Sequence, residues 1–281
     1  MQRRALGATG ENLSLIGMGG IVVSRLPQHE ADAIVAEAVA RGVNYFDVAP
    51  TYGDAEERLG PALEPYRDGV FLACKTGKRD AEAARHELER SLRNLHTDHF
   101  DLYQLHGLTT LAEVETAFGD GGALETVEAA RQEGKVRFIG FSAHSVEAAE
   151  EALRRYRFDS ILFPFNCVCW HHGFGPQVLE AAREAGAARL ALKALARTNW
   201  PEGGEKKWKK CWYQPFDRRE EAALALRFTL SQEVTAAVSS GEPTLFKMAV
   251  EIAEEFEPVG PDELARIAAL AEPLHPIFPE K

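Results

Sequence analysis

Four side chains able to hold or transfer protons follow three successive apolar runs of the sequence. Asp47 and Tyr52 belong to the first run, Lys75 follows the second, and His106 ends the third. A carboxylate within an apolar run is costly unless it is paired, and Lys75 is the candidate partner of Asp47. The same cation would stabilise the phenolate of Tyr52 and lower its pKa from about 10. The four residues therefore predict a site for proton transfer.

A phenol beside an ammonium group is suited to donating a proton where negative charge develops on oxygen, as in the reduction of a carbonyl. Because no side chain donates hydride, this reaction needs a nicotinamide cofactor. His106 would orient the carbonyl oxygen. The structural alternative is a buried ion pair for Asp47 and Lys75 and simple core packing for the two rings. The four residues together favour catalysis.

The elements that must position these residues alternate between strands and helices. Pro50 ends the strand of Asp47, because proline donates no hydrogen bond to a sheet. Apolar runs predict eight strands, at residues 13–18, 43–48, 70–74, 100–105, 136–141, 161–165, 190–195 and 234–238. Helical spacing of apolar residues predicts helices over 31–40, from about 54, from about 80, up to about 129, up to about 156, and over 177–186, 220–230, 245–255 and 263–270.

Eight alternations of this kind in about 250 residues predict a closed (β/α)8 TIM barrel, whose active sites lie at the C-terminal ends of the strands. A doubly wound open sheet is the alternative, but no G-x-G-x-x-G follows the first strand. Turn residues near the start predict an N-terminal hairpin. A long irregular loop over residues 196–217 follows strand seven. We expect one domain over residues 1–281, with a C-terminal helix and tail over 256–281.

Composition narrows the class of protein. The net charge of −11 argues against a nucleic-acid partner or an anionic membrane surface. No apolar run approaches the roughly 20 residues that a bilayer span needs, and the first residues lack the apolar core of a signal peptide. Four cysteines without a disulfide pattern indicate a reducing compartment, so we expect a cytoplasmic protein. The absence of a heptad pattern favours a monomer.

Three segments resemble motifs of the aldo-keto reductase family. Asp47, Tyr52, Lys75 and His106 are similar to its catalytic tetrad, and residues 91–106, SLRNLHTDHFDLYQLH, are similar to the lead into its catalytic histidine. Residues 134–142, GKVRFIGFS, resemble its strand-five motif. The resemblance covers residues 1–255. It implies an NAD(P)H-dependent reduction of a small aldehyde or ketone, or the reverse oxidation of an alcohol, with Tyr52 as general acid.

The resemblance also implies how the nicotinamide is held, with departures from the usual residues. Ser142 is similar to the family serine that binds the carboxamide. Ala143 stands where an asparagine is common, and His144 follows it. Leu162 stands where a glutamine is common, so we expect Asn166 to compensate. The alternative for Ser142 and Asn166 is that they cap strand ends.

At the other end of the cofactor, residues 239–243 lead into a helix whose backbone amides attract phosphate. Lys247 lies near the position of the family's basic residue for the 2′-phosphate, which favours NADP(H), whereas Glu242 would repel a phosphate and leaves NAD(H) possible. A solvated helix lysine is the alternative for Lys247. The complete set of expected cofactor-binding residues is Ser142, His144, Asn166, Lys193, Ser239, Ser240, Gly241 and Lys247.

Two other functions stay open. One is a barrel that binds nucleotide without catalysis and regulates a partner. The other is a metal-dependent hydrolase, because residues 167–172, CVCWHH, carry zinc-ligand side chains. Neighbours this close along the chain rarely converge on one ion, so we predict no metal. The lysine-rich run 206–210 is predicted to be a solvated loop, and the tryptophans around it are predicted to form a mobile lid that shapes the substrate pocket.

Overall fold

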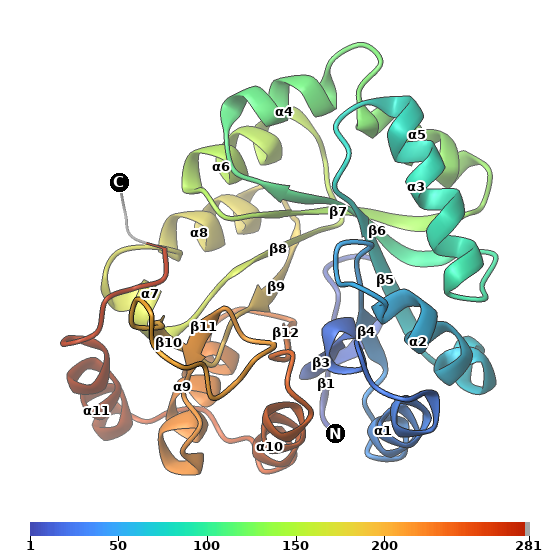
Figure 1. Cartoon of the computed structure of the whole chain (residues 1–281). Helices are drawn as coiled ribbons and strands as arrows, with labels where there is room; N and C mark the ends of the chain where they lie inside the picture. Colours follow the sequence, from blue (N-terminus) through green and yellow to red (C-terminus); the bar gives the residue numbers. More distant parts are fainter. Residues whose placement is uncertain (279–281) are drawn as a thin grey trace.

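Eight short strands pair side by side in the computed structural model, which describes residues 1–278. Each strand is parallel to the next, and the last pairs with both the seventh and the first, so the barrel closes (Figure 1). This confirms the predicted TIM barrel. The strands are β3 (Ile16–Gly19), β4 (Tyr45–Asp47), β5 (Phe71–Thr76), β6 (Phe100–Leu108), β7 (Val136–Ala143), β8 (Ser160–Pro164), β9 (Ala188–Leu192) and β12 (Ala236–Val238).

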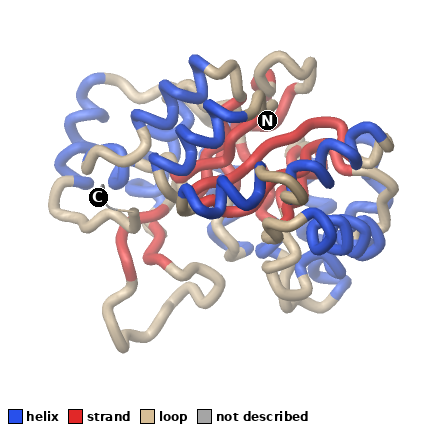
Figure 2. The backbone as a smooth tube through the Cα atoms, turned by 90° about the horizontal axis from the view of Figure 1, so that it is seen from above, coloured by secondary structure: helices blue, strands red, loops and turns tan. Residues whose placement is uncertain are grey.

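Helices surround the strands on the outside of the barrel (Figures 1 and 2). Several begin at a capping side chain that accepts a backbone hydrogen bond three residues on, as Asp80, Thr110 and Ser145 do. Within residues 1–278, no helix has the length and apolar character needed to cross a membrane. The helices are α1 (Gln28–Ala40), α2 (Ala55–Leu63), α3 (Ala81–Asn94), α4 (Leu111–Phe118), α5 (Ala123–Gln132), α6 (Val146–Arg155), α7 (Cys167–His171), α8 (Pro176–Glu184), α9 (Arg219–Ser231), α10 (Pro243–Glu254) and α11 (Pro261–Ala271).

The barrel interior has an apolar layer below a polar one. Tyr45, Leu102 and Leu190 belong to the interior cluster of buried side chains. Because alternate residues of a strand share one face, Asp47 points inward above Tyr45, and Gln104 points inward above Leu102. A second, larger cluster fills the space between the strands and the helices. The strands thus place polar groups inside the barrel at its C-terminal end.

Two antiparallel ribbons lie at opposite ends of the barrel. The predicted N-terminal hairpin is present as β1 (Arg3–Ala5) paired with β2 (Asn12–Ser14). At the opposite end, β10 (Ala196–Asn199) pairs with β11 (Tyr213–Pro215), and the loop between them projects from the molecule (Figure 2). The name ribbon loop is used below for residues 200–212.

The structure corrects several predicted elements. The run 13–18 is divided, because residues 13 and 14 belong to the hairpin and β3 begins at Ile16. The helix predicted up to residue 129 is two helices, α4 and α5, separated at Gly119 and Gly122. The segment 196–217 is not irregular throughout, since β10 and β11 pair within it. Strand β9 ends at Leu192 rather than 195, because Lys193 adopts a left-handed backbone conformation with φ of 61°.

Candidate active site

The centre of the site is a buried ion pair between Asp47 at the end of β4 and Lys75 near the end of β5. The Lys75 ammonium also donates to the carbonyl oxygen of Val48 at 3.3 Å. Burial acts to lower the pKa of Lys75, but the negative charge of Asp47 and the hydrogen bond to it outweigh burial and raise that pKa. Lys75 is therefore a permanent cation inside the barrel, as the sequence predicted.

Two residues that the sequence analysis missed hold the Asp47 carboxylate in place. The Tyr45 hydroxyl donates to its Oδ2 at 3.1 Å, and the Gln104 amide donates to the same oxygen at 3.0 Å. Gly17 makes room for the tyrosine, because a Cβ there would lie 2.3 Å from Cδ1 of Tyr45. Asp47 is thus fixed from three sides. The inward spacing of Tyr45 and Asp47 on one strand was the sequence signal for this contact.

Tyr52 lies between the cation and the histidine. The Lys75 ammonium is 5.6 Å from the centre of the Tyr52 ring. The His106 ring packs edge-on against the Tyr52 ring, with the two ring centres 5.9 Å apart. Burial raises the pKa of Tyr52, while Lys75 lowers it only in part, so the pKa stands above its ordinary value. This differs from the expected lowering of the pKa, because burial outweighs the attraction of Lys75, and the negative charge of Asp47 adds to the rise. Tyr52 is therefore held in its protonated form.

His106 is an uncharged imidazole at neutral pH. Burial, followed by the positive charge of Lys75, lowers its pKa to about 3. Its backbone is fixed by Arg79, which donates to the carbonyl oxygens of His106 at 2.9 Å and Gly107 at 3.1 Å. The hydroxyl of Ser142 accepts from the amide of Gly107 at 2.8 Å. The neutral ring can donate one hydrogen bond to a substrate oxygen but cannot act as a strong acid.

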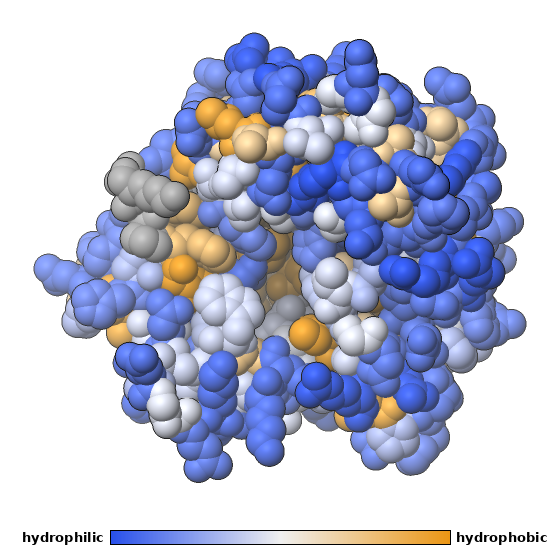
Figure 3. Space-filling view, turned by 45° about the horizontal axis from the view of Figure 1, so that its top comes forward, coloured by the Kyte–Doolittle hydropathy of each residue, from blue (hydrophilic) through white to orange (hydrophobic). Residues whose placement is uncertain are grey.

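The four residues line one cavity of about 240 Å³ at the C-terminal end of the barrel. The surface of this face is hollowed near its middle, with apolar residues visible inside and mostly hydrophilic residues around (Figure 3). The structure brings six of the expected cofactor-binding residues to the same cavity, which are Ser142, His144, Lys193, Ser239, Ser240 and Gly241. Apolar side chains complete the wall, with Leu162, Leu192 and Val238 from strands and Ile21 from the short turn of helix after β3.

Asn166 does not take the place expected for it. It is buried and is absent from the described residues that line the cavity. Its Oδ1 accepts from the amide of Cys169 at 2.9 Å and caps α7, and its Nδ2 lies 3.4 Å from the Cys169 sulfur. The capping alternative therefore describes Asn166, because its amide is committed to the start of a short helix. Leu162 leaves an apolar surface at the position that Asn166 was expected to serve.

Lys247 lies outside the main cavity. Its side chain is 58% exposed on α10 and forms an ion pair with Glu37 of α1 at 3.3 Å. With Arg41 it lines a separate cavity of about 220 Å³ between these two helices. Glu242, at the start of α10, accepts from the backbone amide of Lys210 at 2.7 Å. The Glu242 carboxylate is thus engaged by the ribbon loop.

The ribbon loop and β11 supply cavity residues. Trp212 and Tyr213 belong to the aromatic segment that the sequence analysis placed at the pocket, whereas Lys210 and Cys211 were not expected there. Lys210, Cys211, Trp212 and Tyr213 all line the cavity. The Lys210 ammonium reaches across the cavity mouth to the carbonyl oxygen of Val22 at 2.8 Å. The cluster of tryptophans in this segment was the sequence feature that indicated a place at the cavity.

Gly241 allows this close approach. A Cβ at Gly241 would lie 2.5 Å from Cγ2 of Ile21 and 3.3 Å from the carbonyl oxygen of Lys210. The glycine therefore lets the loop after β3, the ribbon loop and the start of α10 converge at one edge of the cavity. Tyr213 adds a contact of 3.3 Å between its hydroxyl and that of Ser240.

The zinc-like segment does not gather its side chains. Cys167 and Cys169 are buried in α7, whereas His171 is exposed and His172 lies 3.4 Å from the carbonyl oxygen of Ala271. Across residues 1–278, no three side chains of the His, Cys, Asp and Glu types are grouped so that they could hold a metal ion. Successive side chains of the short helix α7 point in different directions, so they do not converge on one point.

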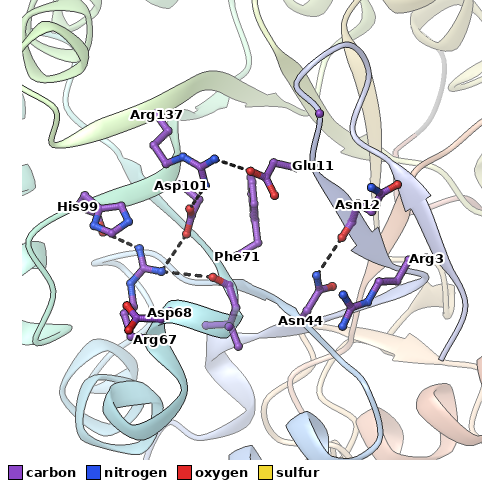
Figure 4. Close-up of a pocket in the computed structure, with 13 residues that line it drawn as sticks. Arg3, Glu11, Asn12, Asn44, Arg67, Asp68, Phe71, His99, Asp101 and Arg137 are labelled. Atoms are coloured by element: carbon purple, nitrogen blue, oxygen red, sulfur yellow. Dashed lines mark hydrogen bonds and ion pairs between the residues drawn. The ribbon is translucent and has the colours of Figure 1, made fainter.

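A larger cavity of about 470 Å³ lies at the other end of the barrel, among residues at the starts of strands (Figure 4). Several of its charged side chains pair with one another. Asp101 pairs with Arg67 at 3.0 Å and with Arg137 at 2.6 Å, and Arg137 also pairs with Glu11 of the hairpin. We assign this network to closing the bottom of the barrel, because its charges are neutralised by their neighbours.

The comparisons of this chain with known proteins agree on one protein family. The model described as "Aldo/keto reductase family" matches residues 15–272. A Bacillus subtilis protein named uncharacterized oxidoreductase YqkF is 31% identical over 180 residues, which cover 59% of this chain and 56% of that protein. Aldo-keto reductase YhdN of the same organism is 31% identical over 219 residues, 70% of this chain and 63% of that protein. The chain thus spans less than two thirds of the length of both.

A longer match is L-galactose dehydrogenase of Arabidopsis thaliana, which is 27% identical over 315 aligned residues that cover 98% of this chain and 95% of that protein. Among solved structures, the holo form of aldo-keto reductase AKR11C1 from Bacillus halodurans is 26% identical with a TM-score of 0.77, and each chain is fully covered. Its apo form is 25% identical with a TM-score of 0.71, again over both whole chains.

Proposed function

The chain belongs to the aldo/keto reductase family, and we propose that it reduces an aldehyde or ketone to an alcohol with NAD(P)H as hydride donor. The observation that carries this proposal is the meeting of Tyr52, Lys75 and His106 around one cavity. A protonated phenol next to a fixed cation and a neutral imidazole is an arrangement for protonating an alkoxide.

Each residue has a separate task in this reaction. The carbonyl oxygen is held by hydrogen bonds from Tyr52 and from the neutral imidazole of His106. As negative charge develops on that oxygen, the Tyr52 hydroxyl transfers its proton to it. The resulting phenolate is stabilised by Lys75, 5.6 Å from the ring centre. Asp47 keeps Lys75 in position, and solvent then returns a proton to Tyr52.

The residues that line the cavity support the binding of a nicotinamide cofactor. Ser142 and the apolar surface of Leu162 and Leu192 are suited to the nicotinamide ring and its carboxamide. Ser239 and Ser240 precede α10, where backbone amides and the helix dipole favour phosphate. The bound cofactor would supply the hydride that the carbonyl carbon receives. The chain's own contribution is to hold that cofactor beside Tyr52.

We further propose a preference for NADP(H). The extra phosphate of NADP(H) would lie near the start of α10, where Lys247 and Arg41 provide positive charge beside the separate cavity. The Lys210 amide holds the Glu242 carboxylate toward the ribbon loop, so the repulsion from its charge depends on how far that direction lies from the phosphate. The ion pair of Lys247 with Glu37 would have to open.

The proposal is tested by a titration of the protein with NADPH and NADH, followed by a panel of aldehydes and ketones. Tryptophan fluorescence reports binding, since Trp212 lies at the cavity. Reduction with NADPH deuterated at the transferred position should place deuterium on the carbinol carbon of the product. Cofactor binding without turnover of any carbonyl would instead favour the regulatory nucleotide-binding barrel. Failure to bind either cofactor would overturn the proposal.

A further inference from the structure

Lys193 enters the cavity because of an unusual backbone turn. Strand β9 ends at Leu192, and Lys193 has φ of 61°, a left-handed conformation that residues with a side chain rarely adopt. Such a conformation persists where the surrounding structure enforces it, and it is enriched at functional sites. The result is an ammonium group inside the same cavity as Tyr52 and His106.

No carboxylate of residues 1–278 forms an ion pair with Lys193. Its ammonium lies 3.1 Å from Nε2 of His144 and faces the rings of Trp212 and Phe278, at 5.8 Å and 5.4 Å from their centres. Burial lowers the pKa of Lys193 to about 7. Lys193 is half-buried, and a cation partly withdrawn from water without an anion beside it is costly. The group is therefore arranged for an anion that residues 1–278 do not provide.

His144 serves to orient that cation. Burial, followed by the charge of Lys193, lowers the pKa of His144 to about 2, so its ring is neutral and accepts from the ammonium. The ring is held by stacking on Phe278, with centres 5.1 Å apart and planes 6° apart. Trp212 meets Phe278 edge-on at 5.9 Å, and its side chain is 49% exposed at the mouth. Aromatic walls and one oriented ammonium thus form a small anion-binding corner.

The location of this corner separates it from the part of the cavity suited to cofactor phosphates. Lys193 is close enough to the reacting groups that its charge contributes to lowering the pKa of His106. The phosphate-binding candidates, Ser239 and Ser240, lie at the start of α10, where the cavity has a different lysine, Lys210. The charge of Lys193 therefore faces the carbonyl substrate rather than the cofactor.

We propose that Lys193, oriented by His144, binds a carboxylate carried by the carbonyl substrate, so that the preferred substrates are aldehydes or ketones that bear an acid group. This inference rests on the proposed function, which supplies the carbonyl site. It also reassigns Lys193, which the sequence resemblance placed with the cofactor-binding residues. The carboxylate would fill the place of the missing anion beside the ammonium, with the rings of Trp212 and Phe278 against the body of the substrate.

The test compares two aldehydes of nearly equal size, para-carboxybenzaldehyde and its methyl ester, methyl para-formylbenzoate. The wild-type protein should show the higher kcat/KM for the carboxylate. Lys193→Met should lower the ratio of the two kcat/KM values by about 10-fold to 100-fold, the range for loss of a charge-assisted hydrogen bond, mainly through KM. Lys193→Arg should restore part of the ratio, because it keeps the charge.

Lys210→Met is the matched control, since it removes a lysine from the other edge of the same cavity. It should leave the ratio near the wild-type value even if both rates change. Equal ratios in wild type and Lys193→Met would overturn the inference while leaving carbonyl reduction intact. A loss of NADPH affinity in Lys193→Met with an unchanged ratio would assign Lys193 to the cofactor and would also overturn it.

A binding measurement keeps this inference distinct from the proposed function. Benzoate carries the carboxylate but no carbonyl that the site can reduce. It should raise the melting temperature of the wild-type protein with bound NADPH, and the shift should be lost in Lys193→Met and kept in Lys210→Met. This result would stand even if no aldehyde were turned over, in which case the proposed reduction alone would fail. No benzoate-dependent shift in the wild type would overturn the anion site.

Discussion

Removing both members of the ion pair at the centre of the site should destabilise the protein less than the sum of the two single losses. Lys75→Met leaves Asp47 with its hydrogen bonds from Tyr45 and Gln104, so we expect a loss near the lower end of the roughly 3–5 kcal/mol that follows when a buried pair is broken. Asp47→Asn leaves the Lys75 ammonium with the Val48 carbonyl as its other hydrogen-bond acceptor. It should cost close to the upper end.

The double variant Asp47→Asn with Lys75→Met carries neither charge, so the penalty for an unpaired buried ion disappears. The two single losses add up to about 8 kcal/mol, but the double variant should lose only about 5, a coupling of about 3 kcal/mol. For a chain of this size, each kcal/mol corresponds to roughly 2–4 °C. The double variant should therefore melt about 6–12 °C higher than additivity requires.

Urea unfolding monitored by tryptophan fluorescence and by circular dichroism gives the four free energies of this cycle. The ion pair between Arg219 and Glu251 is a suitable control, because these side chains are 52% and 37% exposed and lie 2.9 Å apart. A surface pair of this kind should show a coupling below about 1 kcal/mol. Additive losses within about 0.5 kcal/mol for Asp47 and Lys75 would refute the argument that each charge depends on the other.

Three further predictions concern the cofactor, the substrate and pH. NADPH should bind more tightly than NADH, and Lys247→Met should weaken only NADPH, as measured by fluorescence titration; equal wild-type affinities would contradict this. Trp212→Ala should change the relative kcat/KM values across several carbonyls, because Trp212 lines the cavity. Trp208→Ala should leave these relative values near wild type, because Trp208 does not line the cavity and donates a hydrogen bond to Asp217 at 2.9 Å. Equal effects of the two variants would contradict the assignment. The pKa values of His106 and His144 are depressed from 6.5 to about 3 and about 2. Below pH 6.5 the unfolded chain therefore binds protons at these histidines that the folded chain does not bind, so the free energy of unfolding is highest above pH 6.5 and falls as pH falls below it. At pH 5 this loss is about 2 kcal/mol for each histidine, and His144→Gln should flatten the fall seen in urea unfolding; an unchanged slope would contradict it.

The sequence was sufficient for the barrel and for the residues around the reacting position. Strand alternation predicted the fold, and the spacing of Asp47, Tyr52, Lys75 and His106 placed them at adjacent strand ends, where the structure brings them together. These features follow from periodicity along the chain. They depend little on the details of side-chain packing.

Features that depend on tertiary contacts were missed or misassigned. Asn166 caps α7 because a helix of one turn begins directly after β8, which no periodicity revealed. The pKa of Tyr52 rises rather than falls, first because the site is buried from water and then because the negative charge of Asp47 lies nearby. The position of Lys193 depends on one left-handed residue that ended β9 early. The Asn166 cap is a local contact that leaves no periodic pattern, whereas the surroundings of Tyr52 and Lys193 form only in the folded barrel.

The most direct test of the proposed mechanism is the reduction rate of Tyr52→Phe in a single turnover, with NADPH affinity measured on the same sample. This change removes one hydroxyl and leaves the ring against Lys75 and His106. The account predicts that the rate falls by at least about 10²–10⁴-fold, the usual contribution of a general acid, while NADPH binding and the melting temperature stay near wild type. A rate within a few-fold of wild type would show that another group supplies the proton and would contradict the account.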